Sequence, residues 1–99
     1  MAKGKWGASS PLKFCCLLRG GGEKTRILIS VPKKFFKRAV KRNLLKRRIR
    51  ESYRLQKDLL DTAAPVDIMF LYNSPELASS DVIKASVADI LKQVSGWKN

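Results

Sequence analysis

A long basic segment, Phe36 to Lys57, constrains this chain more than any other feature. It contains no Gly or Pro and is rich in Leu, Arg and Lys, which predicts a single long helix. We expect the helix to begin between Lys34 and Arg38 and to end near Leu60. At about 100° per residue, one arc of its surface collects polar and basic side chains, namely Arg42, Asn43, Lys46, Arg47, Arg50, Arg54 and Lys57.

The opposite side of the predicted helix is mainly apolar, which indicates that it packs on a core. It carries Leu45, Ile49, Ser52, Gln56, Leu59 and Leu60, with Leu44 and Leu55 beside them and Lys41 and Arg48 as interruptions. A charged helix face is most often simply solvated. Here, however, Glu51 is the only acid between Lys33 and Lys57, so the arc repels itself unless a polyanion neutralises it. The pattern therefore favours polyanion binding.

Length and charge narrow the class of protein. The 99 residues suffice for one domain, and we expect a flexible segment over residues 1–10 and a single folded domain over residues 11–99. A net charge of +13 points first to nucleic acid and second to an anionic membrane surface. No apolar run approaches the roughly 20 residues of a membrane span, and the N-terminus lacks a signal-peptide core. We expect a cytoplasmic protein that is monomeric when free.

Catalysis by the protein alone is disfavoured. The chain has no His, which removes the usual general base and the commonest metal ligand. Its eight acids are scattered, and none is paired as in a metal-dependent nuclease. The only cysteines, Cys15 and Cys16, are adjacent and lack metal-ligand spacing, so we expect two strand residues that point to opposite faces. No catalytic residue and no metal site are predicted in the protein.

The remaining elements follow from alternation and from turn residues. Strands are predicted over residues 12–18 and 26–31, joined by a Gly-rich loop that is short enough for an antiparallel hairpin. Residues 66–72 are nearly all apolar, which predicts a central strand with both faces buried. Ser80 is the expected N-cap of a last helix that ends at Gly96, with a buried stripe of Ile83, Val87, Ile90, Leu91 and Val94. The order strand, strand, long helix, strand, helix predicts an α/β (α+β) two-layer sandwich.

The segment Ala39 to Glu51, AVKRNLLKRRIRE, resembles the signature of the bacterial ribonuclease P protein family. That signature reads Ala-Val-x-Arg-Asn-x-x-Lys-Arg-x-x-Arg-Glu, and this chain matches each named position. The resemblance extends to the flanks, with a strand ending in Val and the pair Lys33-Lys34 before the motif, and an apolar strand after it. It covers about Leu12 to Val94.

Two features depart from the family pattern. The family usually has a Gly between the Lys pair and the Ala-Val, where this chain has Phe35-Phe36-Lys37-Arg38 with one extra residue. Family members also usually begin with a further helix that carries aromatic residues of a central cleft. Lys3 to Gly7 looks like the loop after such a helix, so we expect either a naturally short member of the family or a sequence that begins at an internal start.

The resemblance implies a protein subunit of ribonuclease P. In that family the RNA subunit removes the 5′ leader of precursor tRNA with Mg²⁺, while the protein binds that RNA through the motif helix and the leader through a cleft on the sheet. Family folds also join the strands around the motif helix by a left-handed crossover, against the general right-handed rule. The implied partners are ribonuclease P RNA and precursor tRNA, with no membrane.

Candidate RNA-binding residues follow from the motif and from side-chain chemistry. Arginine offers planar paired donors to phosphate, whereas the amide of Asn43 suits a base edge, a 2′-hydroxyl or a metal-bound water. For each basic residue that flanks the motif, a role in surface solubility explains its presence nearly as well as RNA binding does. The candidates are Arg42, Asn43, Lys46, Arg47, Arg50 and Arg54, extended by Lys33, Lys34, Lys37, Arg38 and Lys41.

The sequence evidence for a leader-binding cleft is weaker than that for the RNA-binding helix. Phe14, Phe36 and Tyr72 are candidates for stacking on unpaired bases. Each is equally what a small core requires, and the core is favoured for Phe14. Three rival functions stay open: a ribosomal-type RNA-scaffold protein, an independent nuclease and a DNA-binding regulator. The Arg-Asn-x-x-Lys-Arg array argues against the first, the lack of His against the second, and the absence of a helix-turn-helix pattern against the third.

Overall fold

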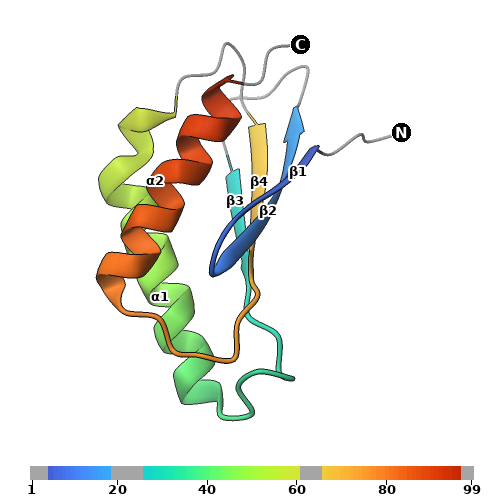
Figure 1. The fold of residues 1–99 in the computed structure, drawn as a ribbon, viewed down its shortest axis with the longest axis vertical. Coiled ribbons are helices and arrows are strands. Elements are labelled where there is room, and N and C mark those ends of the chain that lie inside the picture. The colour runs from blue at the N-terminus through green and yellow to red at the C-terminus, as the bar shows by residue number, and fades with distance from the viewer. Residues whose placement is uncertain (1–4, 19–25, 61–65, 97–99) are drawn as a thin grey trace.

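Two helices lie on the same face of a four-stranded sheet, as the computed structural model shows (Figure 1). The structure describes residues 5–18, 26–60 and 66–96. In chain order the elements are β1 (Lys5–Ser9), β2 (Leu12–Leu18), β3 (Arg26–Ser30), α1 (Ala39–Gln56), the 3-10 helix η1 (Lys57–Leu59), β4 (Val66–Tyr72) and α2 (Ser80–Gly96). The predicted α+β sandwich of helices on a sheet is therefore confirmed, with one strand more than expected.

The strand order is β1-β2-β4-β3. β4 pairs antiparallel with β2 and parallel with β3, so it is central as predicted. The antiparallel hairpin predicted between residues 12–18 and 26–31 is wrong, because β4 lies between β2 and β3. A central position gives the most apolar strand two backbone ladders and keeps it away from an exposed edge. The Gly-rich residues 19–25 lie outside the described residues.

An N-terminal strand was not predicted. Lys5–Ser9 was assigned to a flexible segment, but it forms the edge strand β1, antiparallel to β2. Gly7 packs flat on Phe14: a Cβ at Gly7 would lie 2.5 Å from the ring. The side chains of Gln93 and Ser86 on α2 donate hydrogen bonds to the carbonyls of Ala8 and Ser9. Long-range contacts, which no local pattern reveals, thus hold this short segment.

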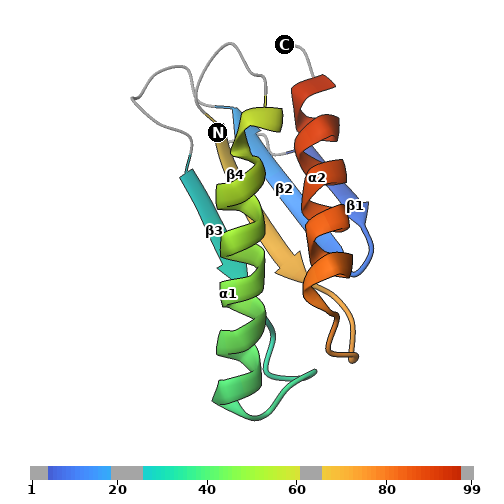
Figure 2. The ribbon, with the colours of Figure 1, turned by 90° about the vertical axis from the view of Figure 1, so that its left-hand side faces the viewer.

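The connection from β3 through α1 to β4 is a left-handed crossover. In Figure 2 the helices lie in front of the sheet, β3 and β4 both run downwards, and β4 lies to the right of β3. A right-handed connection would place β4 to the left in that view. The crossover expected from the family resemblance is therefore present in the structure, and it positions α1 across the β3 side of the sheet.

The core lies between the sheet and the two helices. Alternate residues of β2 are buried as predicted, one face of β4 is buried, and α2 buries its whole predicted stripe. The cap of α2 differs by one residue, since the hydroxyl of Ser79 rather than Ser80 accepts a hydrogen bond from the N–H of Val82, at 3.3 Å. The prediction that both faces of β4 are buried is wrong. Asp67, Met69 and Leu71 are only half-buried, because no helix in the described residues covers that face of the sheet.

Candidate nucleic-acid interface

The segment before α1 is folded into the core rather than into the helix. Phe36 is buried, and its ring centroid lies 5.7 Å from that of Tyr72. A guanidinium nitrogen of Arg42, Nη1, donates hydrogen bonds to the carbonyls of Phe36 and Lys37, at 2.8 and 2.9 Å. The helix therefore begins at Ala39, one residue beyond the predicted range, because the Phe36 ring is used as a core anchor.

A basic ridge runs along the outer side of α1. We use this name for Asn43, Lys46, Arg47, Arg50, Arg54 and Lys57, of which all but the half-buried Lys46 are exposed. Within the described part of the chain, the side chains of Arg47, Arg50 and Arg54 have no hydrogen-bond or ion-pair partner. Three long cations on one helix face repel one another in this state. The ridge is therefore available to an external polyanion.

Arg42 lies apart from the ridge. Its side chain is half-buried and is engaged by the two backbone carbonyls of the entry segment. This contact fixes the loop that carries Lys33, Lys34 and Lys37, all exposed. Lys34 lies over the ring of Phe35, with its Nζ 5.0 Å from the centroid. Arg38 and Lys41 are also exposed, so all the predicted flanking cations are accessible to solvent around the start of α1.

The three aromatic candidates for base stacking are buried. Phe14 and Tyr72 are 0% exposed and Phe36 is 6% exposed, so none offers a ring face to a ligand in this structure. The hydroxyl of Tyr72 donates to the carbonyl of Glu76 and accepts from the N–H of Ala78. These rings fill the space between the sheet and the helices, the alternative that the sequence had left open.

A different aromatic residue is exposed on the uncovered face of the sheet. The register places Trp6, Cys15, Met69 and Leu28 side by side across the four strands. Trp6 is 62% exposed and Leu28 is 67% exposed. We call this set the sheet-face row. Alternation along residues 5–9 could have identified Trp6 as outward-facing, but only if that segment had first been recognised as a strand.

The two cysteines point to opposite faces, as predicted. Cys15 belongs to the sheet-face row, whereas Cys16 is buried under the helices. Burial, and after it the neighbouring Cys15, raises the pKa of the Cys16 thiol from 9.0 to about 11. Cys16 is thus an uncharged core residue at neutral pH.

Two further properties bear on function. Among the described residues, no group of three His, Cys, Asp or Glu side chains is placed to hold a metal ion. None of the helices in the same ranges is long and apolar enough to cross a membrane.

Together, the fold and the ridge define a class: a small α+β domain with a cationic helix face beside a sheet, whose other face no helix covers in the described residues. Comparisons with known proteins identify the family. The family model described as "Ribonuclease P" matches residues 1–95. The ribonuclease P protein component of Porphyromonas gingivalis is 39% identical over 75 residues, which is 71% of this chain and 55% of that protein. That of Chlorobaculum tepidum is 35% identical over 80 residues, covering 70% of this chain and 52% of that protein.

Solved structures of RNase P proteins are similar to this one. The RNase P protein of Staphylococcus aureus has a TM-score of 0.77 and 27% identity, covering 91% of this chain and 80% of that one. The RNase P protein of Thermotoga maritima has a TM-score of 0.80 at 24% identity, over 95% of this chain and 86% of that one, and shows the shared fold. The chain belongs to the ribonuclease P protein family. It spans about half the length of the P. gingivalis and C. tepidum relatives.

Proposed function

We propose that this protein is the protein subunit of a ribonuclease P ribonucleoprotein, which acts in the cytoplasm to remove the 5′ leader of precursor tRNA. One observation carries the proposal. The motif helix of a ribonuclease P family member exposes Asn43, Arg47 and Arg50 on a ridge without acidic partners in the described residues. In this proposal the RNA subunit performs the hydrolysis with Mg²⁺, and the protein supplies binding surface.

The ridge suits the backbone of a folded RNA. Arginine guanidinium groups bind phosphate through two parallel hydrogen bonds, and each phosphate contact releases counterions. Asn43 adds a neutral amide between these cations, which can read a base edge or a 2′-hydroxyl. The protein therefore combines charge with one group that is sensitive to RNA identity.

The leader strand is assigned to the uncovered sheet face. The exposed ring of Trp6 can stack on an unpaired base, and Leu28 and Met69 extend the apolar surface across the strands. Lys13 lies in the next row of the same face and can reach a backbone phosphate. This assignment replaces Phe14, Phe36 and Tyr72 with residues that are accessible.

The test is cleavage of precursor tRNA by the ribonuclease P RNA of the same organism at low Mg²⁺, with and without the protein. We expect the protein to restore cleavage, because its cations offset repulsion between two RNA molecules. Two substrates are compared, one with a long leader and one with a single leader nucleotide. Trp6→Ser should impair only the long-leader substrate, whereas Arg50→Ala should impair both.

The combination of binding and cleavage results shows which part of the proposed function fails. Tight binding to the RNA without restored cleavage would show that the ridge functions and that the sheet face does not serve the leader. Binding to ribosomal RNA that equals binding to ribonuclease P RNA would contradict the proposal and favour an RNA-scaffold protein.

A further inference from the structure

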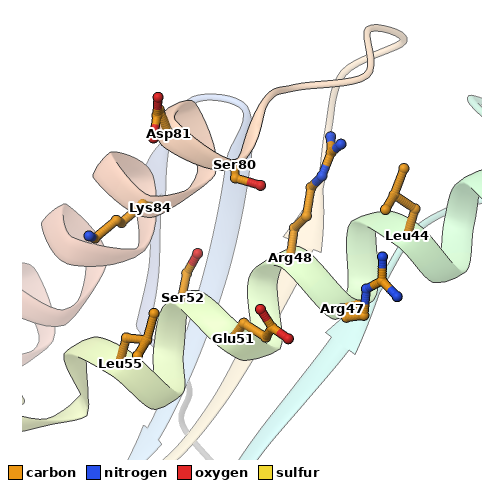
Figure 3. Close-up of a pocket in the computed structure, with 9 residues that line it drawn as sticks. All are labelled: Leu44, Arg47, Arg48, Glu51, Ser52, Leu55, Ser80, Asp81 and Lys84. Atoms are coloured by element: carbon orange, nitrogen blue, oxygen red, sulfur yellow. The ribbon is translucent and has the colours of Figure 1, made fainter.

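A pocket lies between α1 and the first turns of α2, beside the basic ridge (Figure 3). Its volume is about 290 Å³. Sites for drug-sized ligands span roughly 300–1,000 Å³, so this one suits a single small planar group. Figure 3 shows Arg48 and Ser52 projecting from α1 toward α2, and Ser80 projecting from α2 toward Arg48. Neither α1 nor α2 fills the space between them at this level.

The walls combine apolar surface with both kinds of hydrogen-bonding group. Leu44 and Leu55 supply the apolar part, and Arg47, Arg48 and Lys84 supply donors. Glu51 and Asp81 also line the pocket, and a carboxylate would repel a phosphate. The Watson–Crick edges of nucleobases instead present amino donors next to carbonyl or ring-nitrogen acceptors. The mixture fits a base edge better than it fits a free anion.

The pocket is held open before any ligand arrives. Arg48 Nη1 donates a 2.6 Å hydrogen bond to the carbonyl of Ala78, which holds the guanidinium at the pocket wall. Gln56 Nε2 donates to the carbonyl of Lys84 at 3.1 Å and sets the distance between the helices. A fixed guanidinium is a platform on which unstacked bases pack in RNA complexes. Little ordering entropy is then lost on binding.

The pocket is also continuous with the ridge. Arg47 lines it and also lines a shallower hollow formed with Val40, Asn43 and Leu44 on the outer side of α1. An RNA backbone lying on the ridge therefore passes the mouth of the pocket. A peptide helix could cover the exposed Leu55, but it would have to share Arg47 with the RNA.

We propose that the pocket between α1 and α2 receives one unpaired nucleobase of the RNA bound on the ridge. The base packs on the Arg48 guanidinium in the space between the two helices, and its polar edge meets the hydroxyls of Ser52 and Ser80. The inference rests on the proposed function, since it requires an RNA on the ridge. It adds recognition of an extruded base to recognition of the backbone.

The test blocks the pocket without changing charge. Ser80→Trp places a ring at the pocket wall, and Ala85→Trp places the same ring on an exposed position of α2 outside the pocket. In-vitro transcribed ribonuclease P RNA is titrated with each variant at several salt concentrations. We expect Ser80→Trp to lose affinity on the order of tenfold, the size of one lost stacking contact, with an unchanged salt slope. Ala85→Trp should match the wild type.

Chemical probing of the RNA bases supplies the second readout. Wild-type protein should protect one unpaired base that Ser80→Trp leaves reactive. Leu55→Asn, at a side chain that is 68% exposed and so not needed for folding, should weaken the same protection. The proposal is overturned if both variants bind with wild-type affinity and give the wild-type protection pattern, which would leave the pocket for a protein partner. Failure of the proposed function looks different, because wild-type protein itself would then not bind this RNA.

Discussion

The two helices have nearly equal lengths and opposite roles. α2 buries six residues, Ile83, Ser86, Val87, Ile90, Leu91 and Val94, whereas α1 buries only Leu45, Ile49 and Ser52. α1 also leaves Val40 and Leu55 exposed, at 78% and 68%. Burial of apolar surface is the main source of folding free energy, so α2 contributes more to stability than α1. α1 is attached to the rest of the protein partly by hydrogen bonds from Arg42, Arg48 and Gln56.

The two helices also differ in the balance of their charged residues. α2 carries two acidic residues, Asp81 and Asp89, and two basic residues, Lys84 and Lys92, so the charges on its exposed side balance. α1 carries Glu51 as its only acid among seven Lys and Arg residues. A balanced face is what solubility alone requires, whereas an unbalanced one costs stability until a polyanion binds. The difference suggests that α2 is built for the fold and α1 for a ligand.

The largest expected effect tests the structural half of this comparison. Leu91→Ala on α2 should lower the free energy of unfolding by about 2–5 kcal/mol, because it opens a cavity at a fully buried site. Leu55→Ala on α1 removes the same atoms from an exposed site and should change it by less than about 0.5 kcal/mol. Urea unfolding followed by circular dichroism measures both. Similar losses in the two variants would contradict the division of roles.

The next effect tests the ligand half. Arg50→Ala should weaken binding to ribonuclease P RNA roughly tenfold and lower the slope of log K against log salt by about 0.7–0.9, the share of one phosphate contact. Lys92→Ala removes one charge from the exposed side of α2 and should leave the slope unchanged. Titrations at four salt concentrations supply the slopes. If the two variants lose equal slope, net charge rather than the ridge determines binding.

The sequence predicted the features that repeat along one element. The buried stripe of α2 and the alternation of β2 follow from periods of 3.6 and 2 residues, and the exposed ridge follows from the same helical projection. The ridge residues Asn43, Lys46, Arg47, Arg50 and Arg54 could be placed on one side of α1 without knowledge of any contact partner. Their roles in RNA binding stay predictions.

Features that depend on two distant segments were not predictable in this way. Apart from Lys5 and Trp6, β1 has only small residues, and it forms because Gly7 fits against Phe14 and α2 binds its carbonyls. The order β1-β2-β4-β3 depends on competition among strands rather than on any one of them. Phe36 has no local feature that distinguishes a base-stacking ring from a core anchor, and its position against Tyr72 decides between them.

The smallest expected effect concerns Arg42. This residue lies on α1, the helix proposed to bind RNA, but its side chain makes contacts within the protein. Arg42→Lys keeps the charge and loses the guanidinium geometry that reaches the carbonyls of Phe36 and Lys37. We expect a loss of about 1 kcal/mol in unfolding free energy and faster hydrogen exchange at the amide of Phe35, which bonds to the carbonyl of Pro32. Arg47→Lys, at an exposed position, should change neither. Equal behaviour of the two variants would return Arg42 to the ridge as a plain phosphate contact. A selective effect of Arg42→Lys would instead make Arg42 the residue that fixes the Lys33–Lys37 loop beside the RNA.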